Sequence, residues 1–586
     1  MKLFLTRIFV LLLVLASSGL ALDREAFTIT HYQLDVQIDR ASHVMAVTGR
    51  IELRNDSSAP QKSLSLQVSS SLAWNGIAFN GKPVEWIANS YTSDIDHTGS
   101  LSEAVVTLPS PVPTTGKISL DLQYGGTIVA DATRLTRLGA PDELALRNDW
   151  DQISTTFSAV RGLGNVVWYP VSIPAVSMSE GNTVVAAIDA WKFRHKGSQF
   201  DARLHVIAED VKLCIAGTSL TAPCGAFGSM PNPRTEGMVN EVSNDIHLTG
   251  LGKTSPSFAI AVYVRLERPD LTIFHIPNQA LIAREYAAAA EDNGQLLDTW
   301  LPSSQQLALV IELADPNANP FQAGAVLFTP LRHADQNTLS QLLIPPQVAA
   351  RFPAPRPWIE DGLQRFMQAM NAEKRLGRKG ALQFLNQYLP PLQKAQETAH
   401  APGTTASESA ANSLINTSDE ILLRGKSGFV FWMLRDMLGD SVLQHALVAY
   451  RPAQDTSPAY LQTLLEEGRK RDLEWFFDDW VYRDRGLPDF HIESVYPRLL
   501  LENPNKLSLV TVTIENRGRA GAEVPVTLQA PTGEKTLRVL VPANQRASAR
   551  EQTPEMPTRV VVNDGSIPVS DSSETVYAVP AKTEPR

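Results

Sequence analysis

The stretch PRPWIEDGLQRFMQAM, residues 355–370, predicts a helix that packs one apolar face into a core. Pro357 suits the first turn of a helix, where its missing N–H leaves no hydrogen bond unmade. Apolar side chains then recur at helical spacing, at Ile359, Leu363, Phe366, Met367 and Met370. Glu360 and Asp361 are adjacent carboxylates in the first turn, near the positive end of the helix dipole. The stretch therefore predicts a core helix that begins with an acidic pair.

Segments on both sides of this helix predict a mixed α+β region over residues 265–490. The short apolar runs LTIFHI (271–276) and LALVIELAD (307–315) are typical of buried strands, and the Ala- and Leu-rich segment between them is typical of a helix. Two later helical stripes consist of Val430, Met433, Leu434, Met437 and Leu438, which end at Gly439, and of Leu473, Phe476, Phe477, Trp480 and Val481. The polar segment 394–420 has no period and predicts a long mobile loop.

The regions outside the mixed α+β segment have the alternation of strands. HYQLDVQIDR (31–40) alternates apolar and polar residues, and similar runs continue to about residue 264, so 22–264 predicts an N-terminal all-β domain, a large saddle or sandwich. Alternation returns over 491–569, which predicts a small Ig-like β-sandwich. The last residues, 570–586, are expected to form a solvated, flexible tail.

The N-terminal sequence, MKLFLTRIFVLLLVLASSGLA (1–21), has the pattern of a signal peptide. Lys2 and Arg7 precede an apolar run of about nine residues, and small residues follow. An uncleaved membrane anchor is the alternative, although a span needs ~20 apolar residues. No later apolar run has that length. We therefore expect an exported protein, periplasmic or extracellular, with no integral membrane span after removal of the signal.

Two cysteines, Cys214 and Cys224, lie ten positions apart in a segment rich in Gly, Thr, Ser and Pro. In an oxidising compartment this spacing predicts a structural disulfide that closes a short loop. Two free thiols or half of a metal site are the alternatives.

The composition excludes several classes of protein. The chain has 586 residues, of which 43% are hydrophobic and 19% charged, which excludes a disordered, collagenous or coiled-coil protein. Lys and Arg number 52 against 62 acidic residues, so the net charge is -10. Because a nucleic-acid-binding protein needs a basic surface and no basic stripe is present, we expect no nucleic-acid partner.

Three segments, in order, resemble parts of the M1 family of zinc aminopeptidases, which have a thermolysin-like catalytic domain. Residues 355–370 resemble the family's Trp-Leu-x-Glu-Gly helix, GKSGFVFWMLRDMLGD (425–440) resembles the helix after the catalytic tyrosine, and RDLEWFFDDWVYRDRGLPDF (471–490) resembles the end of that domain. WYP at 168–170 is similar to the family's Trp-Phe-Pro. The resemblance implies an N-terminal β-saddle, a thermolysin-like, mainly helical middle domain and a C-terminal Ig-like β-sandwich.

The resemblance also implies a zinc site that this sequence lacks. In the family, two His at i and i+4 bind Zn²⁺, a Glu beside the first His acts as general base, and a Glu on the next helix completes the ligands. No two of the 11 His are four apart, so HExxH is absent. Asp361 occupies the position of the Glu ligand. The family spacing places the two His within LSQLL (339–343), which holds no ligand. A shorter spacing places them within IPPQVA (344–349), where we expect Pro345 and Pro346 to disrupt a helix.

Other parts of the family's catalytic machinery are missing as well. The tyrosine that stabilises the oxyanion should lie about two residues before Lys426, and that residue is Arg424. The Gly-x-Met-Glu-Asn motif that holds the substrate amine should fall near PFQAGAVLF (320–328), which contains no Glu. Because the metal ligands, the base, the oxyanion donor and the amine anchor are all absent, we expect no intact catalytic residues and no cofactor.

Four residues remain as candidates for a degenerate site: Glu360, Asp361, Arg424 and Lys426. The two carboxylates would bind a cation or a peptide amine, or they are an ordinary acidic helix start. The two cations would bind a peptide carboxylate, or they are a solvated helix start.

Further polar residues have simpler interpretations. His333 and Asp361 are the candidate ligands if a metal site has been rebuilt, but a hydrogen-bonded loop histidine is the alternative. Asp478, Asp479 and Asp484 predict a solvated face, because they lack the spacing of a calcium loop.

Three hypotheses for function follow. The first is an exported M1-like pseudopeptidase that has lost zinc and binds a peptide or protein without hydrolysing it. The second is an active M1-type metallo-aminopeptidase with a rebuilt zinc site. The third is a structural or interaction protein of the cell envelope.

Overall fold

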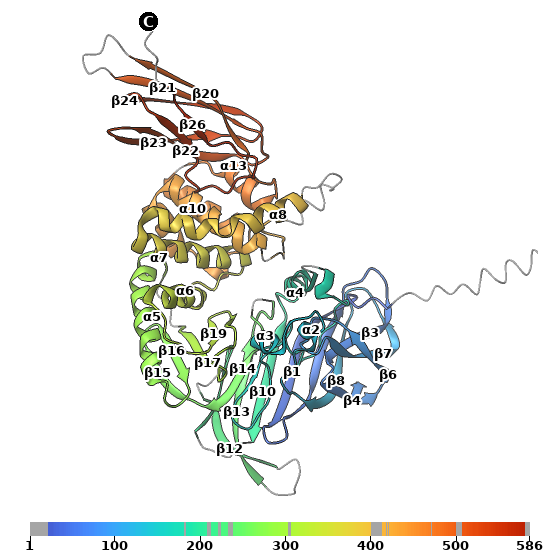
Figure 1. Ribbon diagram of the computed structural model, residues 1–586. Coiled ribbons are helices and arrows are strands. Elements are labelled where there is room, and N and C mark those ends of the chain that lie inside the picture. Colours follow the sequence, from blue (N-terminus) through green and yellow to red (C-terminus); the bar gives the residue numbers. More distant parts are fainter. Residues whose placement is uncertain are drawn as a thin grey trace, which may run out of the picture. The chain divides into compact units, whose positions relative to one another are not determined.

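The computed structural model (Figure 1) describes residues 22–180, 183–207, 212–220, 224–231, 238–252, 254–302, 306–399, 413–417, 419, 421–469, 471–499 and 507–580. The chain forms two compact units, Met1–Val262 and Tyr263–Arg586. The expected signal peptide, 1–21, lies outside the described residues. The chain combines many β-strands with helices, which confirms the predicted mixed α+β class.

An eight-stranded sheet is the main element of the first unit, with strand order β12-β13-β10-β1-β2-β8-β4-β5. Along β1 the side chains of Tyr32, Leu34, Val36 and Ile38 are buried, as their alternation predicts. The strands are β1 (Phe27–Asp39), β2 (Val44–Asn55), β4 (Leu72–Phe79), β5 (Lys82–Pro83), β8 (Lys117–Thr127), β10 (Gln199–Ile207), β12 (Ala226–Pro231) and β13 (Met238–Leu248).

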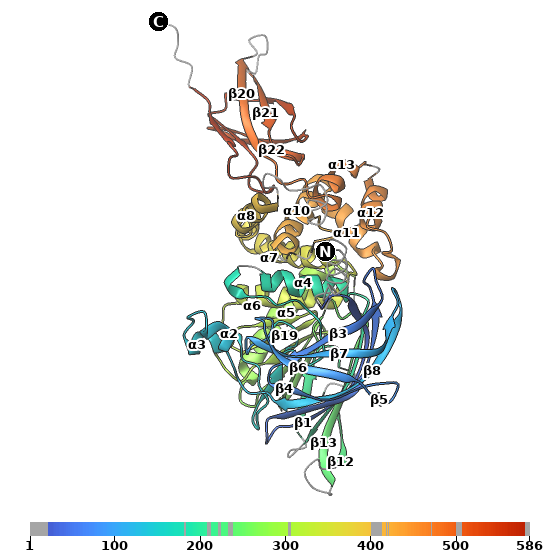
Figure 2. The ribbon, with the colours of Figure 1, turned by 90° about the vertical axis from the view of Figure 1, so that its right-hand side faces the viewer.

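Two three-stranded sheets complete the first unit. One has the order β3-β7-β6, side by side in Figure 2, and the other the order β11-β14-β9. The strands are β3 (Gln61–Ser69), β6 (Glu85–Thr92), β7 (Ser100–Val112), β9 (Ser158–Val160), β11 (Leu213–Gly217) and β14 (Phe258–Val262). All three sheets contribute to one apolar core.

The expectation of an all-β N-terminal domain is wrong in detail, because this unit contains helices. They are α2 (Thr133–Thr136), α3 (Asp142–Asn148), η1 (Met178–Glu180) and α4 (Thr183–Arg194). In α4, Val184, Ile188 and Trp191 recur at helical spacing and turn toward the core, and this short stripe was overlooked among the strands.

The predicted disulfide between Cys214 and Cys224 is confirmed. Cys214 lies in β11 and Cys224 lies just before β12, with a Cα–Cα distance of 4.3 Å. The bond closes a loop of the first unit, in keeping with a structural role.

The second unit begins with a five-stranded sheet of order β15-β16-β17-β19-β18. The three central strands are parallel and the two edge strands are antiparallel to their neighbours. The strands are β15 (Val264–Arg268), β16 (Leu271–His275), β17 (Ala308–Glu312), β18 (Phe321–Ala323) and β19 (Val326–Thr329). The two predicted buried strands are thus β16 and β17, and the helix between them is α5 (Ala280–Trp300).

Helices follow the sheet and include the three predicted stripes. They are α6 (Gln336–Arg351), α7 (Pro357–Asn386), α8 (Leu389–Ala399), η2 (Leu422–Lys426), α10 (Ser427–Leu438), α11 (Asp440–Ala449), η3 (Pro452–Gln454), α12 (Tyr460–Arg469), α13 (Glu474–Phe477) and η4 (Asp478–Tyr482). Pro357 begins α7, as predicted, and Gly439 follows α10 with a φ of 86°. A backbone break at Gly377 (φ 69°) divides α7 into two parts.

Two glycines allow α7 and α10 to pack closely. A side-chain carbon at Gly362 would lie 2.7 Å from the Phe431 ring, and one at Gly428 would lie 2.9 Å from Cβ of Arg365. The helices therefore approach one another where α7 carries Asp361.

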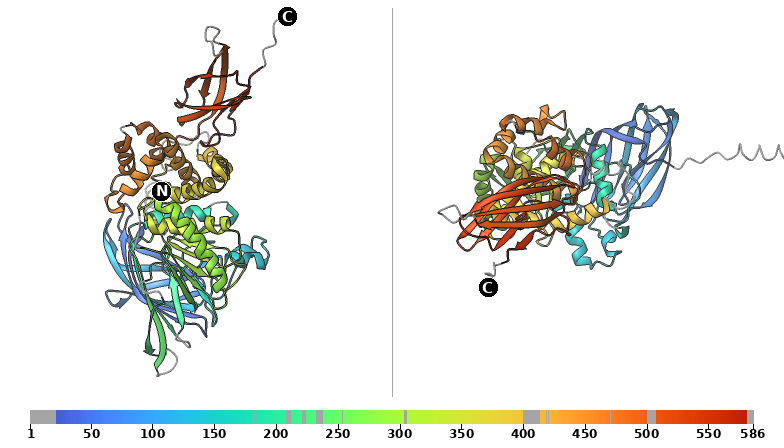
Figure 3. Two further views of the ribbon diagram at one scale, coloured as in Figure 1. Left: turned by 90° about the vertical axis from the view of Figure 1, so that its left-hand side faces the viewer. Right: turned by 90° about the horizontal axis from the view of Figure 1, so that it is seen from above.

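Two sheets form the end of the chain (Figure 3), with orders β20-β21-β24 and β23-β22-β25-β26. The strands are β20 (Phe490–Leu499), β21 (Ser508–Asn516), β22 (Ala522–Ala530), β23 (Gly533–Val541), β24 (Arg546–Thr553), β25 (Arg559–Val562) and β26 (Val576–Ala578). Their core is continuous with that of the helices. Trp480 donates a hydrogen bond from Nε1 to the Gly521 carbonyl at 2.8 Å, and Asp436 of α10 binds Arg378 of α7 and Arg538 of β23.

Two expectations about loops need correction. The tail predicted from residue 570 is wrong for 570–580, because β26 pairs with β25 through Val576, Tyr577 and Ala578. Val576 is β-branched and Tyr577 is aromatic, and both residue types favour a strand. The loop predicted over 394–420 begins later, since α8 extends to Ala399; residues 400–412, 418 and 420 lie outside the described residues. In the described part of the chain, no helix is long and apolar enough to cross a membrane.

Candidate functional site

Asp361 and Arg424, which the sequence analysis considered separately, are brought together by the packing of α7 on the π-helical turn η2. Arg424 Nε lies 3.9 Å from Asp361 Oδ1. The Arg424 side chain is 45% exposed and that of Asp361 is 25% exposed. Glu360, half-buried, lies beside Asp361 in the first turn of α7. The site thus presents a carboxylate pair and one guanidinium toward solvent.

Lys426 does not belong to this open site. Its side chain is 1% exposed, and Nζ lies 3.0 Å from Oδ1 of Asp484, which is fully buried. Gln396 of α8 donates a second hydrogen bond to Asp484, and Lys426 also lies 5.7 Å from the centre of the Trp480 ring. Both interpretations of Lys426, as a contact for a peptide carboxylate and as a solvated helix start, are therefore wrong.

The same contacts correct the prediction of a solvated acidic face. Asp484 is buried, and its carboxylate tolerates burial because Lys426 compensates its charge and Gln396 donates a hydrogen bond to it. Asp478, by contrast, pairs with Arg483 and Arg485, which are both partly exposed. Burial raises the pKa of Asp479, which accepts a hydrogen bond from the Gly521 N–H. These three acids thus have three different environments.

His333 binds an acid on α5 and not Asp361. Its Nδ1 lies 2.9 Å from Oε1 of Glu285, and its side chain is 65% exposed. The interpretation of a hydrogen-bonded loop histidine describes this geometry.

Helix α6 occupies the place where the resemblance puts the two zinc-binding His. Leu339 and Leu343 are buried, and Gln341 and Gln368 of α7 bind each other reciprocally. Gln341 Nε2 donates to the Gln368 carbonyl at 3.0 Å, and Gln368 Nε2 donates to the Gln341 carbonyl at 2.7 Å. Leucines and amides line this position, so it lacks the imidazole and carboxylate ligands that zinc prefers.

The prediction that paired prolines disrupt this helix is wrong, because α6 continues through Pro345 and Pro346. A proline has no N–H for the carbonyl four residues earlier, which for Pro345 is that of Gln341. The Gln368 side chain supplies the missing donor to this carbonyl. The helix therefore tolerates the proline through a contact with its neighbour.

The described residues at the position that the resemblance implies do not fit a zinc ion. Within the described ranges, no group of three His, Cys, Asp or Glu side chains is placed to hold a metal. Asp361, which the resemblance places at the position of a zinc-binding Glu, faces a guanidinium. The strand pair β18–β19 corresponds to PFQAGAVLF and has no carboxylate for a substrate amine; Gln322 instead bonds the Gly324 carbonyl in its turn.

The sequence analysis missed one unusual acid, Glu312 at the carboxyl end of β17. Its side chain is buried, Oε2 accepts a hydrogen bond from the Ile276 N–H at 2.6 Å, and burial raises its pKa to about 7. A single Glu inside the apolar run LALVIELAD is the signal that would have identified it.

Comparison with known proteins adds no relative to this description. No family model matches the chain, and no curated protein matches it. The resemblance to M1 aminopeptidases therefore rests on the quoted segments.

Proposed function

We propose that this chain is an exported, M1 aminopeptidase-like protein that has lost zinc hydrolysis and binds a peptide or protein without cleaving it. The observation that carries the proposal is the pair of Asp361 and Arg424. Asp361 stands where the resemblance places a zinc ligand, and Arg424 stands where it places the catalytic tyrosine. A fixed cation thus faces the carboxylate that would otherwise help to hold a metal.

The chemistry of the guanidinium supports this proposal. Arginine stays protonated at all ordinary pH values and offers only hydrogen-bond donors. It has no open coordination position and does not lower the pKa of a bound water as zinc does. The pair Asp361 and Arg424 can therefore bind the polar groups of a peptide but cannot generate a hydroxide nucleophile.

The architecture of the second unit is consistent with the same proposal. A mainly parallel sheet is followed by α6, α7 and α10, and then by two β-sheets, in the order that the resemblance implies. On α6, leucines and the Gln341–Gln368 contact replace the expected ligands. Export, also expected from residues 1–21, agrees with the presence of the Cys214–Cys224 disulfide.

Metal analysis combined with a peptidase assay tests the loss of hydrolysis. The purified protein should contain no stoichiometric zinc and should not turn over fluorogenic amino-acyl substrates, before or after incubation with Zn²⁺. Stoichiometric zinc together with turnover that Asp361→Ala abolishes would establish the second hypothesis, an active enzyme with a rebuilt site.

Capture of a binding partner tests the open site. Glu360→Gln, Asp361→Asn and Arg424→Gln together should remove a peptide or protein partner that the native chain retains. Arg284→Gln is the matched control, because Arg284 is an exposed arginine on α5. If the triple variant and the control retain the partner equally, a structural role in the cell envelope replaces the proposal.

A further inference from the structure

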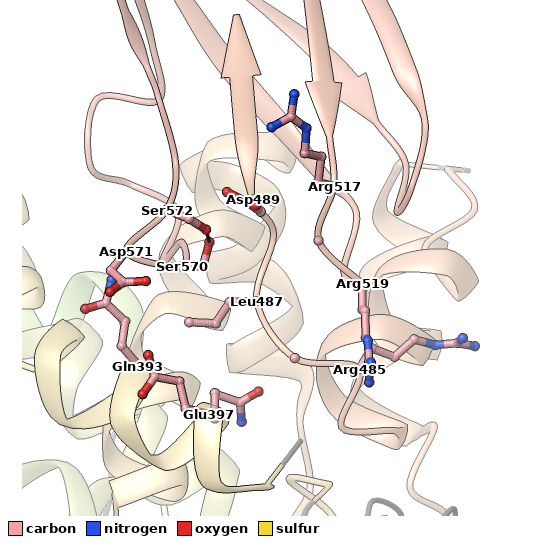
Figure 4. Close-up of a pocket in the computed structure, with 13 residues that line it drawn as sticks. Gln393, Glu397, Arg485, Leu487, Asp489, Arg517, Arg519, Ser570, Asp571 and Ser572 are labelled. Carbon is pink, nitrogen blue, oxygen red and sulfur yellow. Dashed lines mark hydrogen bonds between the residues drawn. The ribbon is translucent and has the colours of Figure 1, made fainter. Parts of the chain in front are cut away.

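A cavity of about 290 Å³ lies within the second unit, between the end of α8, the segment that leads into β20, the β21–β22 turn and residues 570–572. Its volume is at the small end of the ~300–1,000 Å³ that is usual for ligand sites. Figure 4 shows Glu397 and Asp571 on one side of Leu487, and Arg485 and Arg519 on the other. The cavity therefore has an acidic wall and a basic wall.

Several charged groups of this cavity are already paired. Arg485 pairs with Asp478 and Asp479, Arg517 pairs with Glu515, and Asp489 accepts a hydrogen bond from His491. Glu397, Asp571 and Arg519, in contrast, form no ion pair with any described residue. These three side chains carry the charges of the cavity that no described residue compensates.

Gln396, which also lines the cavity, has a buried acceptor without a donor in the described part of the chain. Gln396 is 5% exposed, and its Nε2 donates to Asp484, but its Oε1 has no hydrogen-bond partner among the described residues. Since Gln396 Oε1 has almost no accessible surface, the groups that a ligand in the cavity can reach are the carboxylates of Glu397 and Asp571 and the guanidinium of Arg519.

We propose that this cavity binds a small zwitterion, an α-amino acid or a dipeptide. A protonated amine is a cation with N–H donors and suits the two carboxylates, and a carboxylate suits the planar fork of Arg519. A simple anion would be repelled by the carboxylates of Glu397 and Asp571. A metal ion is disfavoured because no three-ligand cluster occurs in the described residues. The site is separate from Asp361 and Arg424 and does not rest on the function proposed for them.

Calorimetric titration of the full chain with L-alanine and with L-alanyl-L-alanine tests the proposal and separates the two sources of the zwitterion. One of them should bind, and acetylating its amine or amidating its carboxylate should each weaken binding about 10-fold or more, because each removes a charge-assisted contact. Arg519→Gln should weaken binding of the zwitterion but have no further effect on the amide. The double variant Glu397→Gln, Asp571→Asn should likewise weaken binding of the zwitterion but have no further effect on binding of the acetylated compound.

Arg550→Gln is the matched control, because Arg550 is an exposed arginine of β24 that does not line the cavity. It should leave binding unchanged. The proposal is overturned if neither compound binds, or if binding is equal in the native chain and in the Arg519 and Glu397/Asp571 variants, since the ligand would then occupy another site.

Discussion

Arg424 and Lys426 lie two residues apart in one π-helical turn, yet their charges have opposite environments. Arg424 reaches solvent and faces Asp361 at 3.9 Å, whereas Lys426 is buried against Asp484 at 3.0 Å. The sequence analysis gave both residues the same two interpretations. The direction in which the turn points each side chain causes this difference. A charge that points into the core stabilises the fold, whereas a charge that points to solvent can be reached by a ligand.

The largest effect is expected where the buried pair is broken. Lys426→Met should reduce the free energy of unfolding by about 3–5 kcal/mol, because Asp484 would keep a buried charge without its cation. Denaturant unfolding measures this loss. Lys535→Met is the control, since Lys535 pairs with Glu551 on the surface, and it should cost less than about 1 kcal/mol. Equal losses in the two variants would remove the contrast between buried and exposed pairs.

Glu312, a buried acid with no cationic partner among the described residues, should behave differently from Asp484. The pKa of Glu312 is raised from its ordinary value of 4.5 to about 7 by burial. The folded state therefore holds this proton more tightly than the unfolded state. The resulting stability is complete below about pH 4.5 and is lost as the pH rises toward 7, by about 3 kcal/mol in all. Glu312→Gln should remove this part of the pH dependence, measured by unfolding at several pH values. An unchanged pH profile in the variant would contradict the assignment.

A neutral buried contact should have an intermediate effect. Gln368→Leu should cost about 1–3 kcal/mol, because the Gln341 carbonyl would lose its donor within a helix that already contains Pro345. Adding Pro345→Ala should restore part of the loss, since the new N–H can donate to the same carbonyl. Thermal or denaturant unfolding of the single and double variants measures this coupling; no rescue by Pro345→Ala would show that Gln368 acts in another way.

The smallest effect is expected at the open pair. Arg424→Gln should change the free energy of unfolding by less than about 1 kcal/mol, because Arg424 is half exposed and solvent screens its charge. The small change should diminish further in high salt. A loss above about 2 kcal/mol would show that Arg424 stabilises the fold as Lys426 does, and would weaken its assignment to a binding site.

Much of the fold was predictable because it depends on periodicity. The stripe from Ile359 to Met370 became a buried face of α7, and LALVIELAD became β17, since helical and strand periods reflect which face is buried. The disulfide was predictable because the spacing of Cys214 and Cys224 suits a short loop.

The remaining features depend on partners that are distant in the sequence. Lys426 is buried because Asp484, 58 residues later, compensates its charge. Pro345 is tolerated because Gln368 reaches back to α6. Neither contact can be recognised from the residues next to it in the sequence, and the same is true of the pair of Asp361 and Arg424. The absence of HExxH needed no partner to be recognised, so the sequence alone excluded this ligand motif but could not show which contacts lie at its expected position.

The continuous core of helices and terminal sheets has a consequence for how the second unit melts. Trp480 bonds Gly521, and Asp436 joins Arg378 to Arg538, so packing and charge both cross from helix to sheet. The helices α7 and α10 and the C-terminal sheets should consequently lose their structure in a single cooperative step, and these sheets should not persist as an autonomous module when the helices are cut away.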